Sequence, residues 1–141
     1  MTASLVVDAS FTLKLILPGL QQERSRQLVR RWEEARYTLC APTLWLYEIT
    51  SALGKAVHFN MLASEEGRKA LQLAQQLDLR LIQPDDNQTQ LAFDWTLRLN
   101  RAAADDSFYL SLAETLAAEF WTADKRLYNA VNTPWVHYVG D

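Results

Sequence analysis

Short apolar segments alternate with longer amphipathic segments along this chain, and this order is the strongest constraint on its fold. Residues 4–8, 37–41, 79–82, 119–122 and 135–139 are short and mainly apolar, as buried strands are. Most segments between them carry apolar side chains at intervals of three and four residues, as one face of a helix does. Such alternation predicts an α/β fold with a mainly parallel sheet that helices cover on both faces.

Length and composition fit one domain over residues 1–141. Hydrophobic residues make up 49% of the chain, which is enough for a core, and no repeat or linker divides it. The single cysteine, Cys40, cannot form an internal disulfide. No positive side chain precedes the first apolar run, and that run is too short to span a membrane. We therefore expect a cytoplasmic protein that does not associate with a membrane.

Four acidic residues interrupt or follow apolar segments, where ionised carboxylates are rare unless they are paired or bind a metal. Asp8 and Asp124 follow predicted strands, Glu48 lies within an apolar helix, and Asp106 lies at a helix start. Ligands of parallel α/β sheets bind beyond the carboxyl ends of the strands. If the fold gathers the four acids, their repulsion requires a cation, and carboxylate oxygens suit a hard ion such as Mg²⁺. Metal-dependent phosphodiester chemistry is the leading hypothesis.

Each acid also has a purely structural explanation. Asp106 and Asp124 occupy positions typical of helix caps and first turns, and Glu48 can face solvent beside Lys55. By the same reasoning, Asp105 is predicted to cap the helix that begins at Asp106, and Ser10 the helix that begins at residue 11. The joint occurrence of the four acids, in this order, supports the metal hypothesis.

The four acidic segments resemble those of PIN-domain nucleases. Residues 6–10 (VVDAS) resemble the opening strand of that family, and residues 42–53 resemble the helix that carries its second acid. Residues 106–113 and 121–127 are similar to the segments around the third and fourth acids, the last being a TADxxL pattern. The resemblance spans nearly the whole chain and is closest to the small bacterial VapC-like toxins.

This resemblance implies a three-layer α/β/α sandwich and an Mg²⁺- or Mn²⁺-dependent endoribonuclease that is the toxin of a toxin–antitoxin pair. It places hydroxyl groups of Ser10 and Thr122 beside the site. The chain departs from the family at Ser51, where many relatives have Asn, and at Asp105, where an aromatic residue is common. It also implies an RNA substrate, an antitoxin partner and a homodimer, with apolar helices of residues 42–77 as its interface. The implied catalytic and metal-binding residues are Asp8, Glu48, Asp106 and Asp124.

The charge balance does not indicate a broad basic surface for nucleic acid. The formal net charge is −3 at pH 7. Contacts with RNA phosphates must therefore come from local patches or a partner subunit. Lys14, Lys125 and Arg126 are the candidates, because they follow the first and fourth acids closely in the sequence.

Two other functions stay open from the sequence. A catalytically silent PIN-like module would serve binding or scaffolding, although all four acids are present. A receiver-like phosphoacceptor domain requires an acidic pair near the first strand, whereas Asp8 stands alone. No histidine is placed for acid–base catalysis, and no glycine-rich phosphate loop is present.

Overall fold

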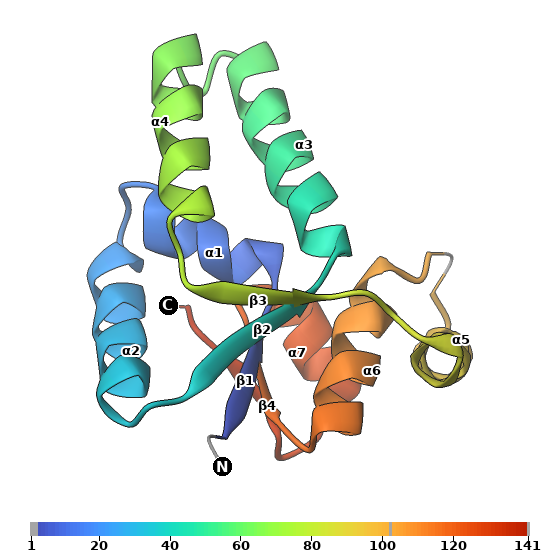
Figure 1. The fold of residues 1–141 in the computed structure, drawn as a ribbon. Helices are drawn as coiled ribbons and strands as arrows, with labels where there is room; N and C mark the ends of the chain where they lie inside the picture. Colours follow the sequence, from blue (N-terminus) through green and yellow to red (C-terminus); the bar gives the residue numbers. More distant parts are fainter. Residues whose placement is uncertain (1–2, 102, 141) are drawn as a thin grey trace.

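A five-stranded sheet forms the centre of the computed structural model, which describes residues 3–101 and 103–140. The strands lie in the order β3-β2-β1-β4-β5, and all four pairings between neighbours are parallel. The predicted mainly parallel sheet is therefore confirmed (Figure 1). The strands are β1 (Ser4–Val7), β2 (Thr38–Pro42), β3 (Leu79–Ile82), β4 (Glu119–Thr122) and β5 (Val136–Tyr138).

Helices form a layer on each face of this sheet. Parallel crossovers are right-handed, so the helices that follow β1 and β2 lie on one face and those that follow β3 and β4 on the other. Figure 1 shows α1 and α2 on one side, α5 and α6 on the other, and α3 and α4 as a hairpin that projects past β3. Over the described residues the helices are α1 (Ala9–Ile16), α2 (Gln22–Glu34), α3 (Leu44–His58), α4 (Ser64–Gln75), α5 (Asp86–Arg98), α6 (Asp105–Leu116) and α7 (Lys125–Val131).

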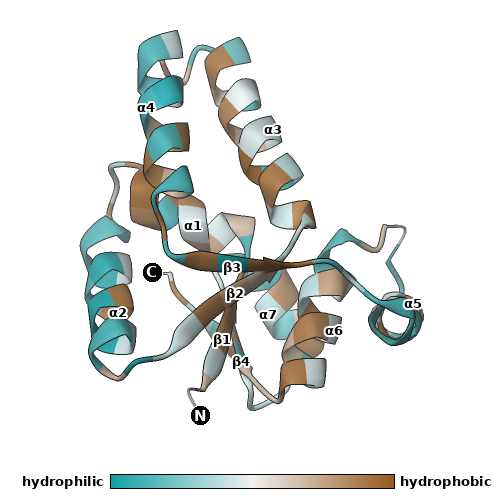
Figure 2. Cartoon of the chain, in the orientation of Figure 1, coloured by the Kyte–Doolittle hydropathy of each residue, from teal (hydrophilic) through white to brown (hydrophobic). Residues whose placement is uncertain are grey.

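The core fills the space between the sheet and these two layers. Val6 and Phe120 on adjacent strands are fully buried, as is Leu110 on α6, and Ile49 on α3 is almost so. Figure 2 shows apolar residues along the central strands and α1, and hydrophilic residues over much of α2 and α4. Burial of such side chains stabilises the fold by about 1.5–3 kcal/mol each.

The direction in which successive connections cross the sheet reverses between β1 and β4. The connection after β1 leads to β2 on one side, and the connection after β4 leads to β5 on the other. At such a reversal, α/β proteins bind ligands beyond the carboxyl ends of the two neighbouring strands. Asp8 and Asp124 follow the ends of these strands by one and two residues.

The start of α3 differs from the prediction. Pro42 was expected to begin a helix, but it is the last residue of β2, and α3 begins at Leu44. Pairing with β3 continues to this point, because Pro42 lies opposite Ile82 and the Thr43 N–H donates to the Ile82 carbonyl over 3.1 Å. Among the described residues, no helix has both the length and the apolar character needed to cross a membrane.

Candidate acidic active site

The Asp8 carboxylate accepts three hydrogen bonds at the end of β1. Its Oδ1 accepts from the Phe11 N–H (2.9 Å) and from the Ser10 hydroxyl (2.7 Å), and its Oδ2 accepts from the Thr122 hydroxyl (2.6 Å). The side chain is buried, with 5% of the residue exposed. Asp8 therefore caps α1, and the prediction that Ser10 caps this helix was wrong because the Ser10 hydroxyl donates to Asp8 instead.

Ser10 and Thr122 also connect Asp8 to the segment of the fourth acid. The Ser10 hydroxyl accepts from the Ala123 N–H (2.9 Å), and the Thr122 hydroxyl accepts from the Asp124 N–H (3.0 Å). Asp124 then caps α7, because its Oδ1 accepts from the Leu127 N–H over 3.1 Å. Both hydroxyl groups thus lie beside the first acid.

Burial makes the Asp8 carboxyl a weaker acid than usual. It raises the pKa of Asp8 from 3.8 to about 6, even though the hydrogen bonds from Thr122, Ser10 and Phe11 lower it, and the charge of Asp106 raises it further. A positive ion beside this carboxylate would offset the cost of keeping it ionised at neutral pH.

Glu48 reaches the same region from α3 and is held by a tyrosine of α6. The Tyr109 hydroxyl donates to Glu48 Oε1 over 2.5 Å. Burial raises the pKa of Glu48, the Tyr109 hydrogen bond lowers it, and the charges of Asp105, Asp106 and Asp8 raise it. Burial and the Glu48 charge also raise the pKa of Tyr109 far above its ordinary value, so its hydroxyl remains a donor.

This role of Tyr109 was not predicted from the sequence. Tyr109 is buried and its ring stacks on Phe120, with 6.0 Å between ring centroids. It lies three residues after Asp106, and residues at this spacing share one helix face. That spacing is the signal that places its hydroxyl toward the acids.

Asp106 lies in the first turn of α6 and pairs with a basic side chain. Arg101 Nη1 lies 3.3 Å from Asp106 Oδ2, and both side chains are 30% exposed. Burial raises the pKa of Asp106, Arg101 lowers it, and Asp124 and Asp105 raise it. Asp105 is exposed and belongs to the same first turn; the prediction that it caps α6 was wrong, because the helix begins one residue earlier, after Ala104.

Each of the four acids thus lies within electrostatic range of at least one other. Asp106 acts on Asp8 and Glu48, and Asp124 acts on Asp106. The described residues contain no ready-made group of three His, Cys, Asp or Glu ligands around one point. Mg²⁺ does not require one, because it binds through one or two carboxylates and keeps several waters. The donors are all oxygens, so the site fits a hard divalent ion with part of its shell filled by water.

The remaining predicted residues lie at different distances from this network. Lys14 is exposed and lines a hollow of about 520 Å³ together with Ser10 and Ala123, so it lies beside the Asp8 network. Lys125 and Arg126 are exposed in the first turn of α7, directly after Asp124. Ser51 is exposed on α3, and within residues 3–101 and 103–140 no hydrogen bond joins it to the acids.

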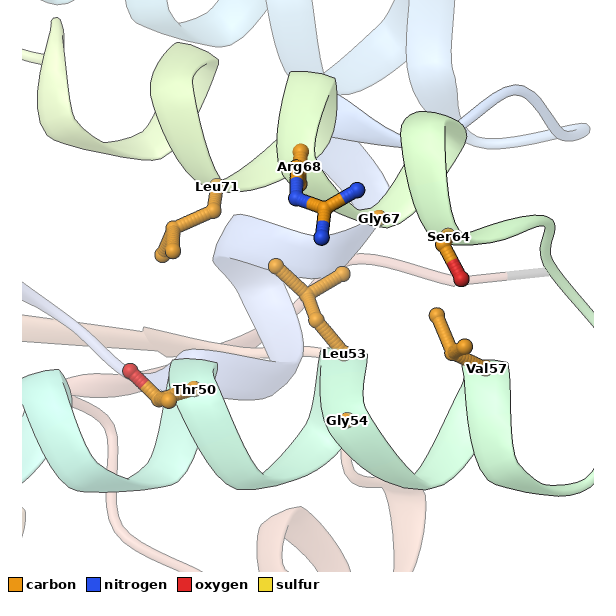
Figure 3. Close-up of a pocket in the computed structure, with 8 residues that line it drawn as sticks. All are labelled: Thr50, Leu53, Gly54, Val57, Ser64, Gly67, Arg68 and Leu71. Atoms are coloured by element: carbon orange, nitrogen blue, oxygen red, sulfur yellow. The ribbon is translucent and has the colours of Figure 1, made fainter.

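A hollow between α3 and α4 is separate from the acidic network. It measures about 320 Å³, and Figure 3 shows Leu53 and Val57 of α3 facing Leu71 and Arg68 of α4. The two helices approach closely here: a Cβ added to Gly67 would lie 2.9 Å from a Val57 methyl group. None of the four acids lines this hollow.

The chain matches one protein family in sequence and resembles several solved structures in fold. The family model "PIN domain" matches residues 5–132. VapBC2 from Rickettsia felis, solved with a DNA fragment from its promoter, has a TM-score of 0.70 at 13% identity and 96% coverage of each chain. The sarcin–ricin-loop-cleaving toxin VapC20 of Mycobacterium tuberculosis has a TM-score of 0.68 at 14% identity, over 94% of this chain and 98% of that chain.

A third solved structure has a similar fold. PAE2754 from Pyrobaculum aerophilum has a TM-score of 0.67 at 19% identity, over 97% of this chain and 84% of that chain. None of the curated protein sequences compared with the chain matches it. At these identities the solved structures establish a shared fold.

Proposed function

Since the chain belongs to the PIN-domain family, we propose that it is a metal-dependent endoribonuclease and the toxin of a toxin–antitoxin pair. The observation that carries this proposal is the buried Asp8 carboxylate, which Ser10 and Thr122 orient within electrostatic range of other acids. A buried acid cluster of this kind is costly unless a cation or a reaction uses it. The similarity to VapC20, a toxin that cleaves the sarcin–ricin loop, supports RNA as the substrate.

The acids would hold Mg²⁺ or Mn²⁺. Asp8 and Asp106 are the proposed direct ligands, and Glu48 and Asp124 would contribute directly or through water. A bound metal of this kind neutralises charge on a phosphoryl group and makes water a stronger nucleophile. The residues around the acids restrict how these carboxylates move.

The orienting role falls to three hydroxyl groups and one guanidinium. Ser10 and Thr122 fix both oxygens of Asp8, and Tyr109 holds Glu48. Arg101 offsets the charge of Asp106. Such outer contacts preserve the orientation of metal-binding carboxylates, and losing one costs about 10- to 100-fold in metal affinity or activity.

Substrate phosphates would be met by local positive charge. Lys14 beside the Ser10 hollow is well placed for this contact, and Lys125 and Arg126 lie next to Asp124. With a net charge of −3, the chain depends on these few side chains and on the metal to attract RNA.

A protein partner is also part of the proposal. A solved toxin–antitoxin complex from Klebsiella pneumoniae has a fold similar to that of this chain. Large exposed apolar side chains fit an interface with an antitoxin or with a second copy of the chain. We propose both partners and a cytoplasmic location. The exposed apolar side chains proposed for this interface include Phe59, Met61 and Leu97.

The decisive experiment combines metal removal with one isosteric substitution. Metal-free protein would be mixed with labelled single-stranded RNA, with and without Mg²⁺ or Mn²⁺, and cleavage would be followed on gels. We expect cleavage only with metal, retention of activity in Asp94→Asn, and loss in Asp8→Asn. Asp94 is a matched control because it is exposed on α5, outside the acid cluster. Undiminished cleavage by Asp8→Asn would refute the mechanism. RNA or antitoxin binding by wild-type protein without any cleavage would favour the silent binding module.

A further inference from the structure

We infer that a hollow beside Glu48 and Asp106 binds a nucleobase of the RNA strand, an inference that rests on the proposed function. We call it the aromatic hollow; Tyr47 and Phe108 line it together with Thr43, Gln83, Leu46 and Pro84. Its volume is about 580 Å³. This lies within the range of small-molecule sites, roughly 300–1,000 Å³.

The aromatic hollow adjoins the acid cluster through two pairs of neighbouring residues. Tyr47 precedes Glu48 on α3, and Phe108 precedes Tyr109 on α6. The hydrogen bond from Tyr109 to Glu48 joins the two helices at this point over 2.5 Å. A group bound between the two rings is therefore held close to the carboxylates.

The hollow also lies at the edge of the sheet where the acids lie. Thr43 directly follows β2 and Gln83 directly follows β3. The Thr43 N–H donates to the Ile82 carbonyl, which keeps the ends of these two strands together over 3.1 Å. The carboxyl ends of parallel strands share one edge, so the aromatic hollow and Asp8 face the same side of the sheet.

The chemistry of the lining fits an uncharged, flat and polar-edged group. None of the described residues that line the hollow is charged, so a phosphate finds no counter-charge there. Tyr47 is 71% exposed, which leaves its ring open to stacking. Thr43 and Gln83 supply neutral donors and acceptors. Proteins bind single-stranded RNA by stacking its bases on aromatic rings and by hydrogen-bonding the base edges.

The order of the strands then suggests a path for the RNA. Along the carboxyl edge, the aromatic hollow lies by β3 and β2, whereas the hollow with Lys14 lies by β1 and β4. Asp8 follows the central strand β1, between them. An RNA strand along this edge would place one base against Tyr47, a phosphate at the acids and a further phosphate near Lys14.

The test compares two probes that carry the same phosphates. One is a short fluorescent single-stranded RNA of randomised sequence; the other is a ribose-phosphate strand of equal length without bases. Fluorescence anisotropy with metal-free protein gives both dissociation constants without cleavage. We expect wild-type protein to prefer the base-bearing strand. We expect Tyr47→Ala to reduce that preference about tenfold and to leave affinity for the abasic strand unchanged.

Three variants control this experiment. Tyr47→Phe keeps the ring and should keep the preference. Phe93→Ala should keep it too, because it removes an exposed aromatic ring from α5, outside the aromatic hollow. Gln83→Ala removes a lining amide without removing a ring, and we expect it to reduce the preference about threefold. Circular dichroism confirms that each variant is folded.

The outcomes separate this inference from the proposed nuclease. Preference lost in Tyr47→Ala supports the base site, even if wild-type protein cleaves no RNA and the nuclease proposal fails. Preference retained in Tyr47→Ala, or weakened equally for both strands, overturns the base site even if RNA cleavage is found. A wild-type protein without preference overturns it as well. A sedimentation change in Tyr47→Ala with the preference intact would overturn it by assigning Tyr47 to a contact between copies of the chain.

Discussion

The Thr122 hydroxyl lies 2.6 Å from Asp8 Oδ2, although 114 positions of sequence separate the two residues. The contact exists because β1 and β4 are neighbours and their ends meet at one edge of the sheet. This hydrogen bond links Asp8 to the segment that carries Asp124. The same Thr122 hydroxyl accepts a hydrogen bond from the Asp124 N–H, so two hydrogen bonds fix its orientation.

Replacing Thr122 by valine tests this contact. Thr122→Val keeps the side-chain shape and removes a buried donor to Asp8, so we expect a loss of RNA cleavage of about 10- to 100-fold. The free energy of unfolding should fall by about 1–3 kcal/mol. Thr115→Val is the control, because the Thr115 hydroxyl donates to the Ser111 carbonyl of the same helix. Equal activities of the two variants would show that the Thr122 hydroxyl does not orient the site.

The raised pKa of Asp8 predicts how the stability of the metal-free protein depends on pH. Folding raises this pKa from 3.8 to about 6, so the folded chain retains a proton that the unfolded chain releases. The stabilisation from that proton is complete below pH ~4 and is lost as the pH rises through ~6, by on the order of 2–3 kcal/mol.

Urea unfolding of metal-free protein between pH 4 and pH 8 measures this effect. Glu48 and Asp106 also have raised pKa values and act in the same direction, so the informative quantity is the difference between wild-type protein and Asp8→Asn. We expect the variant to gain stability relative to wild type as the pH rises. A constant difference across this range would contradict the burial-driven shift.

The elements of the fold could be predicted from the sequence because their signals are local. The predicted bounds of β3 and β4 match those observed, since each is a short apolar run next to a turn or cap. Helix starts were less accurate. Ser10 and Asp105 each have the residue type of a cap, yet Asp8 caps α1 and Ala104 precedes α6.

The contacts within the site could be predicted only in part. The four acids were visible because carboxylates are unexpected in apolar segments. The partners of these acids depend on packing between distant segments: Tyr109 bonds Glu48 across 61 positions, and its sequence context indicates only a core residue. The catalytic and metal-binding roles of the acids stay predictions until they are measured.

Divalent metal should stabilise the protein at neutral pH. A cation at the acids offsets the burial and the mutual repulsion that raise the pKa values of Asp8, Glu48 and Asp106. At metal concentrations about 100-fold above the dissociation constant, binding contributes about 2.7 kcal/mol, which corresponds to a rise in Tm of roughly 5–10 °C.

Thermal unfolding in EDTA, Mg²⁺ and Mn²⁺ measures this rise. We expect Asp8→Asn and Asp106→Asn to lose most of it and Asp94→Asn to keep it, because Asp94 lies on the exposed face of α5. A Tm increase of the same size in all three variants would place the metal elsewhere on the surface.

Removing the hydroxyl of Tyr109 should impair catalysis more than folding. In Tyr109→Phe the ring still stacks on Phe120, but Glu48 loses the donor that holds its Oε1 at 2.5 Å. We expect RNA cleavage to fall about tenfold and the free energy of unfolding to change by no more than about 1 kcal/mol. Tyr128→Phe serves as control, because the Tyr128 ring is partly exposed on α7 and stacks on Tyr138. Steady-state cleavage and urea unfolding of both variants give the two quantities. If Tyr109→Phe loses stability and activity in parallel, as a general packing defect would cause, the hydroxyl has no separate role in positioning Glu48.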